Sequence, residues 1–266
     1  MEIWAVANQK GGVGKTTTVV GLGGLLAARG ARVLLMDLDP HGSLTSYFKY
    51  NPDEIEKSCF QLFQHKGEVP AELPRQLVLN SGFPNLDFIA ASTSLAILER
   101  QAVNQGGMGL VISKTLAHLR NDYDYVLMDT PPILGVLMIN ALAASHRLFL
   151  PVQTEHLAIK GLERMMRTLS MVTKSQKREL AYTVVPTMFD RRTGASVDSL
   201  RILRNTYEDC IWPSAISVDT KFRDASKAGV PPNLYDPTSR GVKAYVSLLK
   251  YILSQDSPAS RKGVSL

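Results

Sequence analysis

A glycine-rich segment near the amino terminus constrains the fold of this chain more than any other feature. An apolar run at Ile3–Ala7 precedes it, and a helical pattern at Gly14–Arg29 follows it. Between them the sequence reads Gln9-Lys10-Gly11-Gly12-Val13-Gly14-Lys15-Thr16-Thr17. Glycines let successive backbone N–H groups converge on one anion, and the following helix adds the positive end of its dipole. The segment therefore predicts a strand, a phosphate-binding loop and a helix.

Two side chains at the end of this segment carry phosphate and metal chemistry. In such a loop the ammonium of Lys15 reaches the outer phosphates of a nucleotide, and the hydroxyl of Thr16 binds Mg²⁺. A glycine turn that only caps a helix does not require the Gly-Lys-Thr string. The expected phosphate-binding residues of this loop are Gly11, Gly12, Val13, Gly14, Lys15, Thr16 and Thr17.

Short apolar runs alternate with longer amphipathic runs along the chain. This alternation predicts an α/β fold with a doubly wound, mostly parallel sheet, helices on both faces and a ligand at the carboxyl ends of the strands. Strands are expected at Ile3–Ala7, Val33–Met36, Leu86–Ala90, Tyr125–Met128, Leu148–Pro151 and Tyr182–Val185. Helices are expected at Gly14–Arg29, Gly109–Arg120, Gly135–Ala144, Lys160–Lys174, Ser196–Tyr207 and Ser239–Leu253. We expect one domain over residues 1–253 and a disordered tail over residues 254–266.

Composition limits the class of protein. The chain has 266 residues, of which 45% are apolar and 2 are cysteines. Two cysteines cannot build a disulfide framework, the first residues do not resemble a secretion signal, and no apolar run approaches the length of a membrane span. We therefore expect a cytoplasmic protein rather than a secreted or membrane-spanning one.

The net charge of +6 is unevenly distributed. Residues 1–154 hold 12 Lys and Arg against 13 Asp and Glu, whereas residues 155–266 hold 18 against 11. The surplus is either scatter over solvated helix faces or a basic face for a polyanion such as DNA. The candidate contacts to DNA phosphates are Arg191, Arg192, Lys221, Arg223, Lys227, Arg240 and Lys243.

Acidic residues follow two of the predicted strands. Asp37 and Asp39 come after Val33–Met36, and Asp129 comes after Tyr125–Met128. A carboxylate at the end of a buried strand lies at the sheet edge where a ligand binds, and there it can face Mg²⁺ through water. The Asp39-Pro40 pair also has the chemistry of a simple turn. Both interpretations of the pair stay open, whereas Asp129 completes the site that the phosphate loop begins.

The string from Lys10 to Thr17 resembles the deviant phosphate loop of the ParA/MinD family of ATPases. The resemblance extends over about residues 2–253, and it implies a Mg²⁺-dependent ATPase that forms a homodimer around two ATP molecules. In that dimer Lys10 would cross to the partner's nucleotide. The Asp37 segment resembles the family's switch I, which implies that Asp39 orients or activates the attacking water and that Asp37 supports the Mg²⁺ shell. The implied catalytic residues are Lys10, Lys15 and Asp39, and the implied metal site comprises Thr16, Asp37, Asp39 and Asp129.

The sequence departs from the family pattern at two places. His41 and Ser43 replace the glutamine and asparagine that are usual in switch I. Thr187 and Met188 lie in a segment that matches the one flanking the adenine, and they are the expected base contacts. Ser217, however, stands where the family usually has a proline beside the base.

The cargo of such an ATPase has to be inferred from smaller features. Because the first strand begins at Ile3, we expect no operator-binding domain before the phosphate loop. Because the tail is polar and contains Pro258, we expect no membrane binding through a terminal helix. The His41-Gly42-Ser43 string is most similar to ATPases that position polar chemotaxis arrays. We therefore expect this cargo, a cargo adaptor or ATPase-activating protein, and a nucleoid-associated or polar location.

Two other functions are considered beside array positioning. The first is a chromosome or plasmid partition ATPase that binds nonspecific DNA and a ParB-type partner. The second is a metabolic or cluster-carrying enzyme with the same loop. Cys59 and Cys210 do not follow the Asp129 strand, so they are not placed to hold a cluster between two subunits.

Overall fold

Seven strands form a sheet in the order β3-β4-β2-β5-β1-β6-β7 within residues 1–65, 67–101, 108–176 and 178–255, which the computed structural model describes. β3 pairs antiparallel with β4, and the remaining neighbours pair parallel. The strands are β1 (Glu2–Val6), β2 (Val33–Asp37), β3 (Val78–Phe83), β4 (Leu86–Ile89), β5 (Tyr125–Asp129), β6 (Arg147–Gln153) and β7 (Ala181–Thr187). The phosphate loop follows β1, which lies between β5 and β6. A ligand is bound in such sheets where the strand order reverses.

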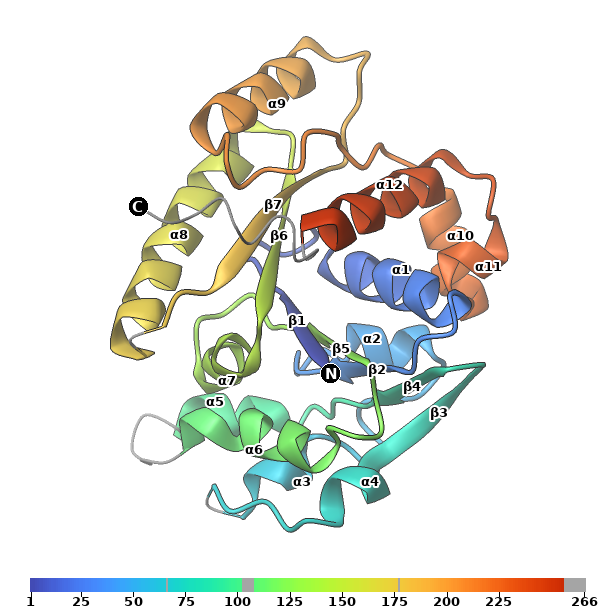
Figure 1. The fold of residues 1–266 in the computed structure, drawn as a ribbon, viewed down its shortest axis with the longest axis vertical. Helices are drawn as coiled ribbons and strands as arrows, with labels where there is room; N and C mark the ends of the chain where they lie inside the picture. Colours follow the sequence, from blue (N-terminus) through green and yellow to red (C-terminus); the bar gives the residue numbers. More distant parts are fainter. Residues whose placement is uncertain (66, 102–107, 177, 256–266) are drawn as a thin grey trace.

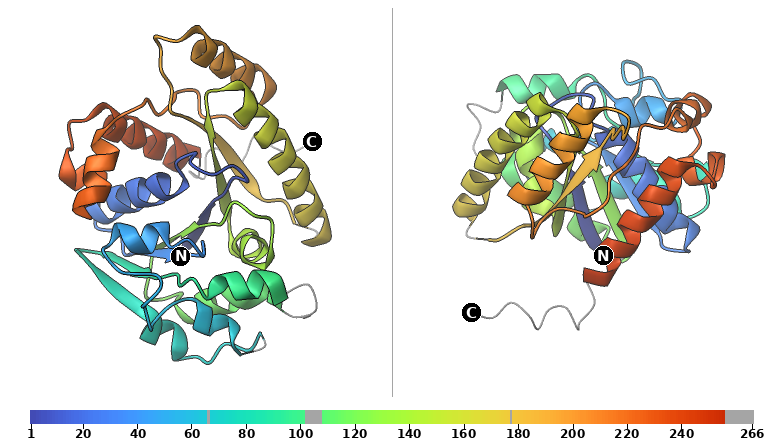
Figure 2. Two further views of the ribbon diagram at one scale, coloured as in Figure 1. Left: turned by 180° about the vertical axis from the view of Figure 1, so that it is seen from behind. Right: turned by 90° about the horizontal axis from the view of Figure 1, so that it is seen from above.

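Helices cover both faces of this sheet (Figure 1). One face carries α1 (Lys15–Ala28) and α12 (Arg240–Gln255), and the other carries α6 (Val111–His118), α7 (Val136–Ala144) and α8 (His156–Gln176). Figure 2 shows the same two layers from behind and from above. The remaining helices are α2 (Ser43–Tyr47), α3 (Phe60–Phe63), α4 (Leu73–Leu77), α5 (Leu95–Gln101), the 3₁₀ turn η2 (Met108–Leu110), α9 (Gly194–Thr206), α10 (Lys221–Ala228) and α11 (Pro232–Tyr235).

The side chains of β1 show why the central strands are apolar throughout. Ile3 and Ala5 pack into the core beneath α6, α7 and α8, whereas Trp4 and Val6 pack into the core beneath α1 and α12. Successive residues of a strand point to opposite faces, so a strand covered on both sides must be apolar at every position. The predicted doubly wound α/β fold is confirmed.

The structure adds elements that the sequence pattern did not predict. β3 escaped prediction because Asn80, Ser81 and Gly82 interrupt its apolar alternation, which an edge strand tolerates. The short helices α2, α3, α4, α5, α10 and α11 were also not expected. Ser254 and Gln255, expected in the tail, belong to α12, and residues 256–266 lie outside the described residues. In the described part of the chain, no helix has the length and apolar character needed to cross a membrane.

Trp4 is the side chain of β1 that contributes most to packing. It is fully buried, and its ring makes edge contacts with Tyr125 and Phe149 at centroid distances of 5.1 and 5.3 Å. Trp4→Ala is expected to lower the free energy of unfolding by about 3–5 kcal/mol, because the cavity cannot close within a parallel sheet. Urea denaturation measures this loss. Trp4→Phe keeps an aromatic ring and should lose clearly less; an equal loss in both variants would contradict the packing argument.

Candidate functional site: a nucleotide cleft at the end of β1

The loop after β1 forms the floor of a cleft of about 800 Å³. Gly12 and Gly14 adopt φ values of +72° and +93°, a conformation that side chains with a Cβ rarely adopt. The loop is attached to neighbouring strands, because the Thr187 hydroxyl donates to the Val13 carbonyl at 3.0 Å and the Asn8 amide donates to the Pro151 carbonyl at 2.8 Å. Residues 11–17 all line the cleft. The backbone is therefore already arranged as an anion-binding loop.

A cation-binding corner lies beside this loop. Lys15 is only 8% exposed, and the Thr16 hydroxyl donates to Oδ2 of Asp129 at 2.5 Å. The other oxygen of Asp129, Oδ1, is buried and has no hydrogen-bond partner among the described residues. A buried carboxylate oxygen without a partner is costly unless a cation or water satisfies it. Hydroxyl and carboxylate oxygens are the ligands that Mg²⁺ prefers, so this corner fits the ion.

Asp37 lies next to Asp129 on the adjacent strand, but its carboxylate is already hydrogen-bonded to other groups of the protein. Oδ2 accepts hydrogen bonds from the amide and the hydroxyl of Thr45 at 2.8 and 2.7 Å, and Oδ1 accepts one from the Asp39 amide at 3.1 Å. Asp37 thus holds the chain between β2 and α2. Burial raises the pKa of both Asp37 and Asp129, and a bound cation would lower both pKa values again.

Asp39 lies farther along the same loop and lines the cleft. Its side chain is 11% exposed, and its Oδ1 contacts both the amide and the Nδ1 of His41, at 3.0 and 2.8 Å. Gly42 follows at φ +61°, and a Cβ there would lie 2.2 Å from Pro52. His41 and Gly42 therefore have local structural roles around Asp39.

Apolar side chains are also among the residues that line the cleft, and they suit a base. Thr187 and Met188 line the cleft, and their contact with adenine stays a prediction. Sequence reasoning missed most of its other lining residues, which come from distant elements: Ile216, Ser217, Val218, Asp219, Thr220, Phe222 and Tyr245. Tyr245 is anchored by a 2.9 Å hydrogen bond between its hydroxyl and that of Thr18. No local motif marks Tyr245, because only the packing of α12 on α1 places it there.

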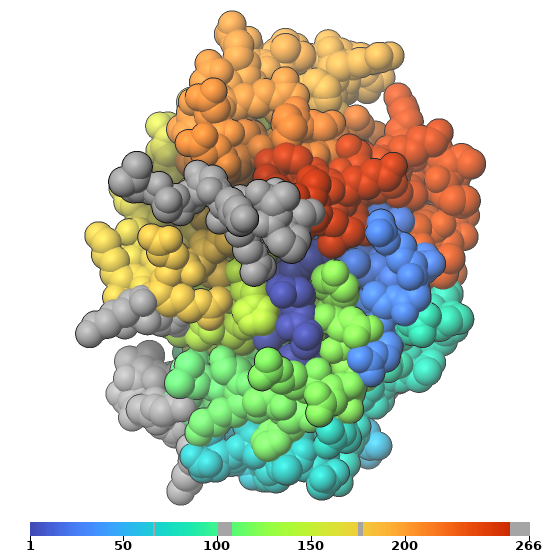
Figure 3. All heavy atoms as spheres, in the orientation of Figure 1, coloured from blue at the N-terminus to red at the C-terminus, as the bar shows by residue number. Residues whose placement is uncertain are grey.

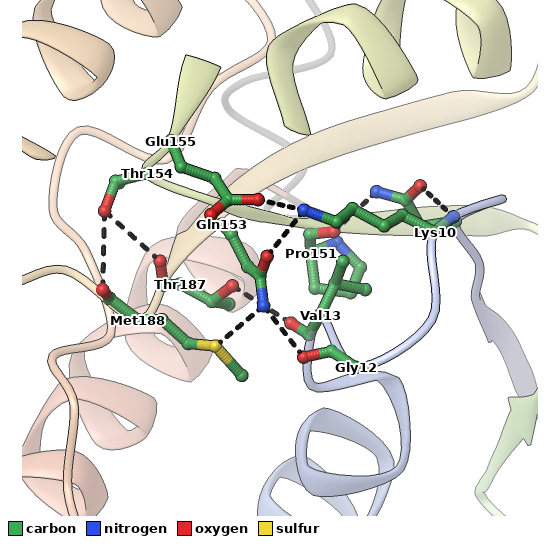
Figure 4. A network of polar contacts seen from close by, with 10 residues as sticks. Lys10, Gly12, Val13, Pro151, Gln153, Thr154, Glu155, Thr187 and Met188 are labelled. Carbon is green, nitrogen blue, oxygen red and sulfur yellow. Dashed lines mark hydrogen bonds and ion pairs between the residues drawn. The ribbon is translucent and has the colours of Figure 1, made fainter. Parts of the chain in front are cut away.

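Lys10 is not among the residues that line the cleft. Its ammonium instead contacts two acceptors at the end of β6 and just after it, the side-chain oxygen of Gln153 at 2.8 Å and the carboxylate of Glu155 (Figure 4). The amide nitrogen of Gln153 donates to the Gly12 carbonyl at 3.1 Å. The two lysines of the loop therefore have different positions: Lys15 lies in the cleft and Lys10 outside it.

The seven candidate DNA contacts are exposed, but they are not equivalent. Arg192 pairs with Asp190 at 2.7 Å, and Lys221 lies 3.8 Å from Asp224. Arg223 lines the nucleotide cleft. In the space-filling view, the orange and red segment from α9 to α12, which contains most of these cations, occupies a continuous region at the top and right (Figure 3).

Comparison with known proteins identifies the family. An AAA domain model matches residues 1–182. The chain is 35% identical to the sporulation initiation inhibitor protein Soj of Bacillus subtilis, over 94% of this chain and 98% of the relative. It is 33% identical to the chromosome partitioning protein ParA of Caulobacter vibrioides, over 98% and 97%. The chain belongs to the ParA-like ATPase family.

A solved structure agrees with this assignment to the ParA-like family. It is described as cobyrinic acid a,c-diamide synthase from Mycobacterium smegmatis with bound ADP and magnesium, and it is 32% identical with a TM-score of 0.80. The match covers 96% of this chain and 95% of that one. The expected family is thus confirmed, whereas the relatives favour partition over the positioning of chemotaxis arrays.

Proposed function

We propose that this ParA-like chain is a partition ATPase that works as an ATP-dependent dimerisation switch. The observation that supports the proposal is the different position of the two lysines in the phosphate loop. Lys15 lies in the cleft beside Thr16 and Asp129, whereas Lys10 is not among the residues that line the cleft and its ammonium contacts Gln153 and Glu155 instead. A cation in that position acts on a nucleotide only when a second subunit approaches, as an arginine finger does.

ATP and Mg²⁺ are the cofactors of this chain. The backbone of residues 11–14 would hold the phosphates with Lys15, and Thr16 and Asp129 would hold the ion. Bound Mg²⁺ neutralises charge on the outer phosphates. The relative from Mycobacterium smegmatis contains ADP and magnesium, or an ATP analogue and magnesium, in a similar fold.

Hydrolysis in this proposal depends on Asp39 and on the partner's Lys10. Asp39 lines the cleft with a side chain that is 11% exposed, and its carboxylate would accept a hydrogen bond from the attacking water and orient it toward the terminal phosphate. Asp37 supports the site indirectly, because its carboxylate holds the Asp39 amide and Thr45. The ammonium of Lys10 would stabilise the charge that develops on the partner's phosphates.

The cargo in this proposal is DNA rather than a chemotaxis array. The array interpretation rested on His41-Gly42-Ser43, and two of these residues have local roles beside Asp39 and Pro52. The names of the relatives from Bacillus subtilis and Caulobacter vibrioides refer to sporulation control and chromosome partitioning. The dimer would bring two basic surfaces together, bind nonspecific DNA of the nucleoid, and respond to a ParB-type partner that activates hydrolysis.

The test is a pair of measurements on Asp39→Ala, which should bind ATP and not hydrolyse it. In Mg·ATP this variant is expected to be a stable dimer by light scattering, because the closed state cannot reopen through hydrolysis. A monomer under these conditions would overturn the switch. The name of the relative from Mycobacterium smegmatis suggests a competing function, the formation of an amide on a small-molecule acid. That function would require ATP hydrolysis that depends on the acid substrate and not on DNA.

DNA binding by the trapped dimer is expected to be steeply salt-dependent. For six to ten phosphate contacts, log K should fall with log salt at a slope of roughly −5 to −9. Arg191→Ala should weaken binding to all DNA sequences equally and make the slope of log K against log salt less steep by about 2 per dimer. Arg192→Ala should change both quantities less, because Arg192 is paired with Asp190. Lys114→Ala, on the distant α6 and paired with Glu68, is the control. Filter binding with duplexes of unrelated sequence measures the binding constant at each salt concentration. A slope near zero would contradict the proposed binding to DNA phosphates.

A further inference from the structure

Lys10 is held by its own subunit through a pair of acceptors that face it from one short segment. Its ammonium contacts Oε1 of Gln153 at 2.8 Å and the carboxylate of Glu155 (Figure 4). The side chains of Lys10 and Glu155 are 32% and 51% exposed, so the ion pair lies at the surface rim. These contacts join residues more than 140 positions apart in the chain.

The segment that carries the two acceptors is firmly attached. The Thr154 amide donates to the Thr187 carbonyl at 3.1 Å, and the Thr154 hydroxyl lies 2.6 Å from that of Ser196 on α9. The carbonyl of Glu155 accepts the amides of Ala158 and Ile159 in the first turn of α8. Because this backbone has fixed partners on β7, α8 and α9, the main chain of Glu155 stays in place if Lys10 moves, and only the glutamate side chain is free to rotate.

The backbone of Lys10 is fixed as well, so only its side chain can move. The Lys10 amide donates to Oδ1 of Asn8 at 3.0 Å, and Asn8 in turn donates to the Pro151 carbonyl. A lysine side chain is long and flexible, and its ammonium can exchange one set of acceptors for another. To reach a partner's phosphates, this ammonium must leave Gln153 and Glu155.

We propose that Gln153 and Glu155 are positioning residues that dock Lys10 in the resting subunit, and that this dock opposes closure of the ATP dimer. The inference rests on the proposed function, because it assumes that Lys10 acts on the partner's nucleotide. Gln153 also links the dock to the nucleotide, since the same amide group that accepts from Lys10 donates to the Gly12 carbonyl in the phosphate loop. Occupancy of the loop by phosphate is thereby connected to the release of Lys10.

Glu155→Gln tests the dock, because it removes the charge and keeps the size of the side chain. In the nucleotide-free protein, the rate at which acetic anhydride modifies Lys10, followed by mass spectrometry, should rise about two- to fivefold, the range for a half-exposed ion pair. Closing one dimer releases two docks. The dimer dissociation constant in Mg·ATP, measured by analytical ultracentrifugation, should therefore fall by about 4- to 25-fold.

Glu163→Gln is the matched control, since Glu163 is also exposed on α8 and pairs with Lys160 at 3.3 Å. It should raise the modification of Lys160 and leave both Lys10 and the dimer constant unchanged. Unchanged reactivity of Lys10 in Glu155→Gln would overturn the dock. If Lys10 became more reactive in Glu155→Gln but the dimer dissociation constant stayed the same or rose, the claim that the dock opposes dimer closure would be overturned. A wild-type chain that stays monomeric in Mg·ATP would overturn the proposed function, whereas the reactivity of Lys10 would still decide whether the dock exists.

Discussion

Lys15→Ala is expected to weaken ATP binding by about 10²- to 10⁴-fold, which corresponds to the loss of one or two hydrogen bonds to charged phosphate oxygens. Lys15 is 8% exposed and lines the floor of the cleft. Its charge also lowers the pKa of Asp129, so its removal should raise that pKa and favour the protonated carboxyl, which binds Mg²⁺ less well. Isothermal titration with ATP and Mg²⁺ measures the change.

Two control variants test whether the loss of ATP binding is specific to Lys15. Lys114→Ala removes a lysine that pairs with Glu68 on the surface, and it should bind ATP as the wild-type chain does. Lys15→Arg keeps the charge but not the shape, and should bind more weakly than wild type and more tightly than Lys15→Ala. If Lys15→Ala bound ATP within threefold of wild type, the cleft would not be the nucleotide site.

Lys10→Ala is expected to have the second largest effect, a loss of hydrolysis of about 10³-fold or more, the magnitude of a cation supplied in trans. ATP binding by the monomer should change little, because Lys10 does not line its own cleft. Dimer formation in Mg·ATP should also weaken, since the partner's phosphates lose a contact. Steady-state phosphate release and nucleotide titration separate the two effects.

Mixing two inactive variants shows whether Lys10 acts in trans. In a heterodimer of Lys10→Ala and Asp39→Ala subunits, the nucleotide on the Lys10→Ala subunit has an intact Asp39 and receives Lys10 from its partner. With random pairing, half of the subunits form heterodimers with one working site each, so about a quarter of the wild-type rate should return. Without any recovery, Lys10 would have to act within its own subunit.

Local sequence was sufficient for the features that depend on neighbouring residues. The phosphate loop could be predicted because Gly12, Gly14 and Lys15 follow an apolar strand and begin a helix, and each step has a short-range physical cause. Asp129 could be predicted because it ends a buried strand. The edge strand β3 could not, since Asn80 and Gly82 remove the alternation on which a strand prediction depends.

The predicted cargo, a chemotaxis array, is supported less well than its alternative, partition, for a related reason. A difference in one short string, at His41 and Ser43 of His41-Gly42-Ser43, was interpreted as a mark of the cargo. In the structure His41 contacts Asp39, and Gly42 avoids a clash with Pro52. A local variant can therefore reflect how a loop fits its own surroundings, whereas similarity over the whole chain to relatives in sporulation control and chromosome partitioning favours partition.

The sequence by itself determined the loop, the order of the longer helices and of every strand except β3, and the family, because these depend on residues close together in the chain. Only the tertiary structure decided which distant groups meet. It placed Tyr245 against Thr18, Thr45 on Asp37, and Gln153 and Glu155 on Lys10. Parallel strands bring their carboxyl ends to one edge, however far apart they are in sequence. The family resemblance of the sequence implies a catalytic role for Lys10, whereas only the fold shows that its ammonium contacts Gln153 and Glu155.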